Sequence, residues 1–370
     1  MMIYFAESFK KLRLKKGLTQ EQAADLFGVS PQAVSRWECG TTTPDISLLP
    51  TIADYFDITI EELLGTEKSR REERIRAYED KFHTAITHGQ ITDCIEIARA
   101  GVKEFPNSYV LLNKLMYALF VAGSDDADIP DWKENMEKYK FEIIELGEKI
   151  LSGCTDDEIR IEAKSRLGFH YCEIGEREKG RKILETLPSD AFCRERNICH
   201  ALNGEELLQH ICHQTAQFTY DLVWNIWRYA KRASCPAREQ LAFINTMEQI
   251  VRLIYDDGNL GCWYYLLPRL YLIGKAPLLI ELGDYDMAIG LVETSADYLE
   301  QYEKLPDISY YQSPLLKQAV HKKYIDTADS RSQAQILYED HLTESSYDAI
   351  REEERFKKAV QRIYELAQRR

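Results

Sequence analysis

Residues 17–44 carry the sequence GLTQEQAADLFGVSPQAVSRWECGTTTP, which decides how the first part of the chain folds. Thr19 has a glutamine three residues after it, the spacing of a capping box, so a helix begins here. Gly28 can take the positive φ that a tight turn after this helix requires. Ser30 and Pro31 suit the N-cap and first position of a second helix, because the hydroxyl accepts an orphan N–H and proline has none to satisfy. The stretch predicts two short helices joined by a tight turn.

The second of these helices has an inner and an outer face. Val34 and Trp37 lie three residues apart, which is the spacing of one helix face, and both are apolar. Gln32, Ser35 and Arg36 point away from that face. The pattern predicts a helix-turn-helix with an apolar inside and a polar, hydrogen-bonding outside.

This stretch resembles the helix-turn-helix of phage lambda-type repressors and Cro, the XRE family of bacterial DNA-binding regulators. The resemblance extends over roughly residues 4–65, about a sixth of the chain. It implies a five-helix, lambda-repressor-like DNA-binding domain. The matching residues are Leu18, Thr19, Gln20, Glu21, Ala24, Gly28, Val29, Ser30, Val34, Ser35, Trp37, Glu38 and Gly40.

The resemblance implies that the second helix lies in the major groove of DNA. Gln32, Ser35 and Arg36 would then contact base edges, since glutamine and arginine form paired hydrogen bonds with adenine and guanine. Gln20 would contact a phosphate or a base edge at the start of the first helix. The threonines after the second helix would contact phosphates through hydroxyl and backbone groups. The full set of candidate DNA-contacting residues is Gln20, Ser30, Gln32, Ala33, Ser35, Arg36, Thr41, Thr42 and Thr43.

Other residues of the motif have structural roles. Trp37 shares the face of Val34, so we expect it in the core rather than stacked on a base. Arg13 and Glu38 match positions that form a partly buried ion pair in the family. Gly40 is expected as the C-cap of the second motif helix.

The same kind of signal outlines the rest of residues 1–66. Phe5, Phe9 and Leu12 have helical spacing and predict a first helix over residues 4–16. Asp45 is expected to cap a fourth helix, and Thr59 to cap a short fifth one. We therefore place a helix-turn-helix DNA-binding domain at residues 1–66, followed by a charged linker helix at residues 67–77.

The charge balance is unusual for a DNA-binding protein. The 370 residues contain 47 Lys and Arg against 61 Asp and Glu, a net charge of −14. Residues 1–44, however, hold six basic and four acidic side chains, a local charge of +2. Local charge governs docking on phosphate, so this part of the chain still favours DNA. There is neither a signal-peptide pattern nor a stretch of membrane-spanning length, and we expect a cytoplasmic protein.

Cysteine and histidine usage favours neither disulfides nor metal. Nine cysteines without a CxxC pair fit reduced thiols. One cluster has ligand-type residues, but its spacings match no common zinc site, and packing or surface roles are favoured. No catalytic motif is present, so we predict no enzyme, no metal and no cofactor. The cluster consists of Cys193, Cys199, His200, His210, Cys212 and His213.

Residues 78–370 are predicted to be helical nearly throughout, in pairs of helices with a glycine at each turn. The segment LGFHYCEIGEREKGRKILETLP, residues 167–188, resembles a tetratricopeptide repeat, although Gly180 stands where such repeats carry alanine. No alternating pattern is long enough for a sheet. The fold class is therefore all-α, with a tetratricopeptide-like α-solenoid after the DNA-binding domain.

Aromatic residues concentrate in the middle of this solenoid. Packing between helices is the favoured role, and a pocket for a peptide or small ligand is the alternative. They are Phe218, Tyr220, Trp224, Trp227, Tyr229, Trp263, Tyr264, Tyr265 and Tyr271.

Two functions fit these features. The first is a sequence-specific transcriptional regulator that binds double-stranded DNA at an inverted-repeat operator as a homodimer. In it, the repeat domain senses an oligopeptide or small-molecule effector or mediates dimerisation. The alternative is a protein-interaction adaptor whose repeats bind a partner protein while the N-terminal domain localises it to DNA.

Overall fold

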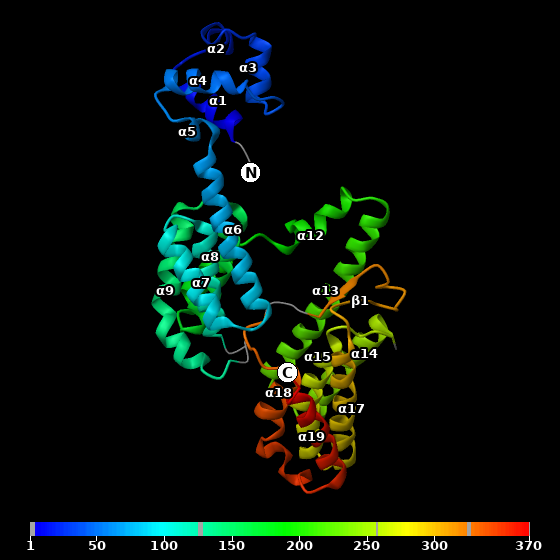
Figure 1. The fold of residues 1–370 in the computed structure, drawn as a ribbon. Coiled ribbons are helices and arrows are strands. Elements are labelled where there is room, and N and C mark those ends of the chain that lie inside the picture. Colours follow the sequence, from blue (N-terminus) through cyan, green and yellow to red (C-terminus); the bar gives the residue numbers. More distant parts are fainter. Residues whose placement is uncertain (1–3, 125–128, 257, 324–326, 370) are drawn as a thin grey trace. The chain divides into compact units, whose positions relative to one another are not determined.

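The computed structural model describes residues 4–124, 129–256, 258–323 and 327–369 (Figure 1). The chain divides into two compact units, residues 1–84 with 93–115 and residues 85–92 with 116–370. Helices supply nearly all of the regular structure, which confirms the all-α prediction. The domain boundaries proposed at residues 66 and 78 remain predictions.

Five short helices form the N-terminal domain (Figure 1). The Thr19 and Thr59 side chains each cap a helix in a complete capping box, and Gly28 is left-handed with φ 66°, as predicted. Asp45 was expected to cap the fourth α-helix, which is wrong: it accepts from the Ser47 N–H and caps a 3₁₀ turn that precedes this helix. The helices are α1 (Phe5–Lys15), α2 (Gln20–Phe27), α3 (Pro31–Glu38), α4 (Leu49–Phe56) and α5 (Ile60–Leu64), with the 3₁₀ turn η1 (Ile46–Leu48).

Aromatic side chains make up much of this domain's core. Trp37 is only 4% exposed, which confirms its predicted core position. Its ring stands edge-on to those of Phe5 and Phe9, with centroids 6.2 and 5.8 Å away. Gly40, expected as the C-cap of α3, lies one residue beyond it: Cys39 is the C-cap, and Gly40 takes the left-handed conformation with φ 71°.

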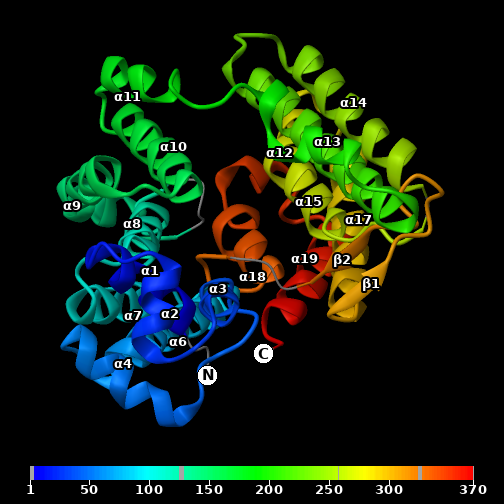
Figure 2. The same ribbon diagram turned by 90° about the horizontal axis from the view of Figure 1, so that it is seen from above.

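The rest of the chain continues in helices. α13 lies beside α14, and α17 contacts both α15 and α19 (Figure 2). The elements are α6 (Thr66–Thr87), α7 (Ile91–Glu104), α8 (Tyr109–Ala122), α9 (Trp132–Gly153), α10 (Asp157–Glu173), α11 (Arg177–Leu184), η3 (Asp190–Phe192), α12 (Arg194–Asn197), η4 (Ile198–His200), α13 (Gly204–Arg232), α14 (Ala237–Tyr255), α15 (Trp263–Arg269), η5 (Leu270–Lys275), α16 (Ala276–Glu281), α17 (Tyr285–Lys304), α18 (Gln333–Ile336), η6 (Leu337–Leu342), η7 (Ser345–Ile350) and α19 (Glu354–Ala367).

Glycines turn the chain between the predicted helix pairs. Gly89, Gly175 and Gly283 all have positive φ, at 68°, 88° and 79°, and each joins two helices. Gly180, the departure from the repeat pattern, has a steric reason. A Cβ on Gly180 would lie 2.5 Å from the Gly168 carbonyl oxygen, so α10 and α11 approach too closely for alanine.

In the described ranges, three features depart from the predicted helical pattern: a short hairpin and two π-helical segments, the second of them at Leu337–Leu342. Ile308–Tyr310 (β1) and Val320–Lys322 (β2) pair as a short antiparallel hairpin. Each strand has three residues, too few to show an alternating pattern in the sequence. Leu270–Lys275 forms a π-helical segment just before Pro277, which lies in the first turn of α16. Proline has no N–H to continue the regular ladder, and the wider turn accommodates it.

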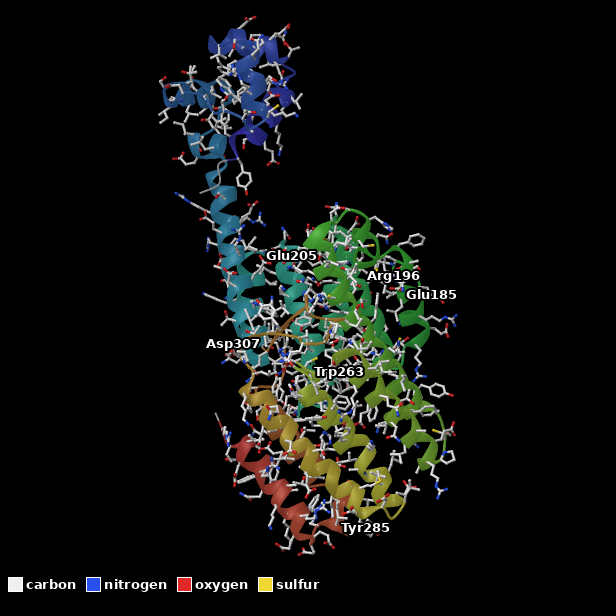
Figure 3. The ribbon with its side chains drawn as sticks, turned by 90° about the vertical axis from the view of Figure 1, so that its right-hand side faces the viewer. Glu185, Arg196, Glu205, Trp263, Tyr285 and Asp307 are labelled. Carbon is white, nitrogen blue, oxygen red and sulfur yellow. The ribbon has the colours of Figure 1, made fainter. Side chains whose placement is uncertain are left out.

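A large apolar core fills the body around Trp263, which is 0% exposed (Figure 3). No helix in the described ranges is long and apolar enough to cross a membrane. Within the same ranges, no group of three or more His, Cys, Asp or Glu side chains could hold a metal ion.

Candidate nucleic-acid interface and ligand cavity

The outer face of α3 carries the predicted base-contacting side chains. Gln32 and Arg36 are exposed and Ser35 is half-buried. The Arg36 Nε donates a long hydrogen bond, 3.3 Å, to the Gln32 carbonyl, which lays the side chain along the helix. Arg36 can therefore swing outward at the loss of one weak contact.

Two other candidates help to build the helix start. The Ser30 hydroxyl accepts from the Ala33 N–H at 3.2 Å, so it serves as the N-cap of α3. Ala33 itself is half-buried and has no polar side chain. A DNA contact by Ala33 would depend on the close approach that its small side chain allows. A DNA contact by Ser30 would depend on its hydroxyl proton, which the N-cap hydrogen bond leaves available.

A buried ion pair anchors the motif to α1. The Arg13 Nη2 donates to the Glu38 Oε2 at 2.9 Å, and the two side chains are only 8% and 3% exposed, which confirms the predicted pair. Burial by itself would raise the pKa of Glu38, but hydrogen bonds from Arg13 and Gln20 lower it overall. The carboxylate therefore stays charged inside the domain.

Gln20 takes part in the same cluster. Its Nε2 donates to the Glu38 Oε2 at 2.8 Å, a contact that the sequence did not reveal. The amide at the start of α2 is thus held in one orientation by the last residue of α3. A fixed orientation suits a contact with DNA, because the rotamer entropy is already lost.

The three threonines after α3 are exposed. The backbone N–H groups of Thr41 and Thr42 donate to the Arg36 carbonyl at 3.0 and 3.4 Å and so close the end of the helix. Because these two N–H groups are engaged, the threonine hydroxyls are the better candidates for phosphate contacts.

A cavity of about 1660 Å³ lies in the second unit. Drug-sized ligands occupy pockets of roughly 300–1,000 Å³, so this space suits something larger, such as a peptide of several residues. Helix α13 contributes Tyr220, Trp224 and Trp227 to its wall, and Tyr265 and Tyr302 come from α15 and α17. Flat rings on several sides offer stacking surfaces for apolar side chains.

The predicted aromatic cluster therefore has three fates. Trp263 and Tyr271 are core residues, with exposed fractions of 0% and 1%, as the favoured interpretation held. Tyr220, Trp224, Trp227 and Tyr265 line the cavity, so a role in binding a peptide or small ligand stays a prediction for them. Tyr264 is partly buried against the same core, and its hydroxyl donates to the Gly258 carbonyl at 3.2 Å. Phe218 and Tyr229 neither fill the core nor line the cavity and are exposed on α13.

The cavity wall is rich in cations although the chain is strongly acidic. Arg228 and Lys231, one helical turn apart on α13, line it together with Arg269 from α15. Burial lowers the pKa of Lys231, with Glu344 opposing this effect. A partly desolvated ammonium gains from a nearby anion, so the wall favours a carboxylate. The six basic residues of the wall are Arg228, Lys231, Arg269, Lys323, Arg331 and Arg369, against the acidic Glu303 and Asp329.

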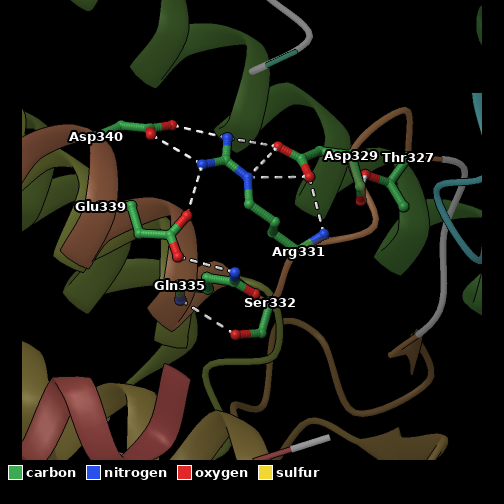
Figure 4. Close-up of polar contacts among 7 residues, drawn as sticks. All are labelled: Thr327, Asp329, Arg331, Ser332, Gln335, Glu339 and Asp340. Atoms are coloured by element: carbon green, nitrogen blue, oxygen red, sulfur yellow. Dashed lines mark hydrogen bonds and ion pairs between the residues drawn. The ribbon is translucent and has the colours of Figure 1, made fainter. Parts of the chain in front are cut away.

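One side of the cavity is a short loop, residues 327–332, which we call the strap. The Arg331 guanidinium lies among three carboxylates: it donates to Asp329 at 2.7 Å, to Asp340 at 2.8 Å and to Glu339 at 3.2 Å (Figure 4). These hydrogen bonds, above all that with Asp340, raise the pKa of Arg331 despite its burial. Ser332 then caps α18 by accepting from the Gln335 N–H at 3.1 Å. The network joins the strap to the segment Leu337–Leu342 (η6), which carries Glu339 and Asp340.

The strap is also bonded to the turn between α6 and α7. The Thr327 N–H donates to the Ile86 carbonyl at 3.1 Å, and Asp329 pairs with Gln90 in an antiparallel bridge. A Cβ on Gly89 would lie 2.2 Å from the Asp329 carbonyl oxygen. The backbone of the strap, which forms part of the cavity wall, therefore contacts the backbone at the end of α6 and in the turn that follows it. Sequence analysis missed this site, because no local pattern reveals contacts across 240 residues.

Comparison with known proteins supports the interpretation of the N-terminal domain. A family model described as helix-turn-helix matches residues 9–63. The HTH-type transcriptional activator BcrR of Enterococcus faecalis is 44% identical over 64 residues, which are 17% of this chain and 31% of BcrR. The chain thus spans less than a third of that relative's length. The HTH-type transcriptional regulator YqaE of Bacillus subtilis, itself uncharacterized, is 32% identical over 103 residues, which are 27% of this chain and 87% of YqaE.

Solved structures show a more distant likeness. Bacillus thuringiensis PlcR, in complex with the peptide PapR7 and DNA, is similar over 81% of this chain and 95% of PlcR, with 18% identity and a TM-score of 0.33.

Proposed function

Because the chain belongs to the helix-turn-helix transcriptional regulators, we propose that it binds an inverted-repeat operator as a homodimer and adjusts this binding to a peptide held in its cavity. We place this activity in the cytoplasm. The observation that carries the sensing part is the cavity itself, whose aromatic and cationic wall includes a strap bonded to the end of α6.

On the DNA side, the proposal assigns base contacts to Gln32, Ser35 and Arg36 of α3 and a supporting contact to Gln20. Two copies are needed because one domain of this size makes few contacts, and specific binding by single modules is correspondingly weak. The local excess of positive charge in residues 1–44 is small, which also favours a dimer.

On the effector side, the wall favours a peptide that carries a carboxylate and at least one apolar side chain. Arg228, Lys231 and Arg269 would bind the carboxylate, because charge-assisted hydrogen bonds are strongest to a partly desolvated partner. Trp224 and Trp227 would pack against the apolar side chain. The volume is larger than a single amino acid needs, so we favour a peptide over a small metabolite.

The route from cavity to DNA runs through the strap. A ligand that displaces or tightens residues 327–332 would act on Ile86, Gly89 and Gln90, since the strap is bonded to them. Helix α6 begins at Thr66, one residue after the C-cap of α5, and ends at Thr87 within this turn. Effector and operator then become coupled ligands, and each must change the affinity for the other by the same factor.

The first experiment is selection of bound sequences from a random DNA pool with the purified full-length chain at a stated salt concentration. The proposal expects an enriched inverted repeat. Selection is then repeated with a synthetic random heptapeptide library, and the operator affinity is expected to change. The double variant R228Q/K231Q should lose the peptide effect and keep the operator, whereas the exposed α11 variant R181Q should behave as the wild type. An unchanged peptide response in R228Q/K231Q would refute the assigned site.

The adaptor alternative makes a different prediction. A chain purified from cell extract would then retain a protein partner in fixed stoichiometry, and peptides would have no effect on operator affinity.

A further inference from the structure

Helix α13 carries a row of large apolar side chains that stay largely exposed, although the Arg196 guanidinium lies 5.8 Å from the centre of the Phe218 ring and the Tyr229 ring contacts that of Phe243, with centroids 5.4 Å apart. Leu208, Ile211, Phe218, Leu222 and Tyr229 are 46–62% exposed. The face of the same helix about 100° away, one residue after each of Ile211, Phe218, Leu222 and Tyr229, is buried in the core through Cys212, Thr219, Val223 and Ala230. Contiguous exposed apolar surface of this kind marks a site of association.

The spacing of the row is that of a coiled-coil seam. Steps of three and four residues alternate through positions 208, 211, 215, 218, 222, 225 and 229, a heptad pattern over three repeats. Thr215 and Asn225 are the two polar members. A period of 3.5 residues keeps a seam facing a second helix over the whole contact, whereas packing on a globular body needs no such regularity.

The seam is symmetric about residue 220. Reflection about this point exchanges Ile211 with Tyr229, Thr215 with Asn225, and Phe218 with Leu222. Two copies that pair antiparallel about a two-fold axis therefore bring these apolar residues against apolar ones, and the polar residue of one against that of the other. Leu208, at the end of the row, would lie beside Arg232 of the second copy, whose aliphatic stem can pack against it. Such self-complementarity is what an isologous dimer interface requires.

The charges at the two ends of α13 select the same orientation. Glu205 and Glu206 lie in its first turn and Arg232 lies in its last, whereas the neighbouring Lys231 belongs to the cavity wall, with its ammonium 4.6 Å from the centre of the Trp227 ring. Figure 3 shows Glu205 at the start of this helix. Parallel pairing would bring like charges together, whereas antiparallel pairing brings the acidic end within about one turn of the basic end of the partner helix. The ends of the two helix dipoles also attract in this arrangement.

We infer that the chain dimerises by antiparallel pairing of α13 with α13 of a second copy. The inference supplies the homodimer that the proposed function requires, and it can be tested without DNA or effector. It leaves the cavity accessible to ligand, because Trp224 and Trp227 lie on a different face of α13 from the seam.

The test is the mass of the purified full-length chain in solution, by light scattering and sedimentation equilibrium. The wild type should have twice the 43.0 kDa chain mass. Leu222→Glu places a charge at the centre of the seam and should raise the dimer dissociation constant at least 100-fold. Leu253→Glu on α14 is the matched control, since Leu253 is 78% exposed and lies outside the seam; it should remain dimeric. Circular dichroism checks that both variants keep their helix content.

Charge variants test the orientation. Arg232→Glu should raise the dimer dissociation constant about tenfold. Adding Glu205→Arg in the same chain should restore it, because position 205 of each copy then again carries the charge opposite to that at position 232 of the other copy. A dimeric L222E would refute the α13 interface and leave the proposed regulator standing. A wild type that stays monomeric at tens of micromolar, with and without its selected operator, would refute both the interface and the dimeric regulator. A weakened dimer that E205R does not restore would refute the antiparallel pairing.

Discussion

The buried pair of Arg13 and Glu38 offers the sharpest test of how the DNA-binding domain is held together. Arg13→Met keeps a long apolar stem and removes the guanidinium. The Glu38 carboxylate, whose side chain is 3% exposed, would then retain only the Gln20 amide as a partner at 2.8 Å. An isolated buried charge is strongly unfavourable, so the domain must unfold locally, take up a proton or admit water.

The expected loss in the free energy of unfolding is large relative to the total stability of so small a domain. Removing one partner of a buried pair costs about 3–5 kcal/mol. A domain of roughly 60 residues has about 3–9 kcal/mol in total, at about 0.05–0.15 kcal/mol per residue. R13M should therefore leave a substantial fraction of residues 4–65 unfolded, with the rest of the chain unchanged.

Hydrogen exchange followed by mass spectrometry measures this in the full-length chain. Amides of α1, α2 and α3 should lose protection by a factor of about 10² to 5 × 10³, since each 1.36 kcal/mol is a factor of ten. The double variant R13M/E38L should recover most of it, because an apolar pair leaves no buried charge. Arg181→Met, which breaks an exposed pair with Glu185, is the control and should change nothing. Normal protection of α1–α3 in R13M would show that the ion pair does not support the domain.

Three further predictions address other parts of the molecule. The pKa of Glu38 is lowered in the folded domain. The charged carboxylate therefore stabilises the domain at pH values above its ordinary pKa near 4.5, and this stabilisation is lost as the pH falls through the lower pKa of the folded state. The urea midpoint of the domain should drop between about pH 5 and 3, and it should drop less in E38Q. Arg36→Ala should cost about 1–3 kcal/mol and relax preference at one base position of the selected operator, whereas a uniform loss on all sequences would assign Arg36 to phosphate. Gly89→Ala should displace the strap and alter the response to peptide, because its Cβ would lie 2.2 Å from the Asp329 carbonyl oxygen. Gly283→Ala is the control: its φ is similar and there is open space around it, so it should cost only the conformational strain of a positive φ. Equal effects of the two variants on the peptide response would count against the role of the strap.

Local signals predicted most of the DNA-binding domain correctly. The Thr19 and Thr59 capping boxes, the turn at Gly28 and the Pro31 helix start depend on residues no more than four positions apart. Their physics is complete within a single turn of helix, so it can be deduced from sequence. The same holds for the inner position of Trp37, which follows from helical spacing.

The resemblance to the XRE family predicted one long-range contact of the DNA-binding domain but not a second one. It supplied the pair of Arg13 and Glu38, 25 residues apart, but not the Gln20 amide that completes the cluster. Gly180 was noted as a departure from the repeat pattern. Its cause lies in the close crossing of α10 and α11, which involves the backbone of another helix.

The sequence by itself predicted that the chain is helical nearly throughout, where most helices of residues 4–65 begin and turn, and that the outer face of α3 is polar, because these depend on short-range sterics, capping and periodicity. Only the tertiary structure decided which aromatic residues fill the core, which line the cavity and which remain exposed on α13. Trp224, Trp263 and Phe218 are all large aromatic residues on helices, and their sequence patterns alone do not separate them. Their environments depend on which distant helix packs against each face, and the position of the strap depends on its backbone contacts with Ile86 and Gln90, which lie more than 200 residues earlier in the chain.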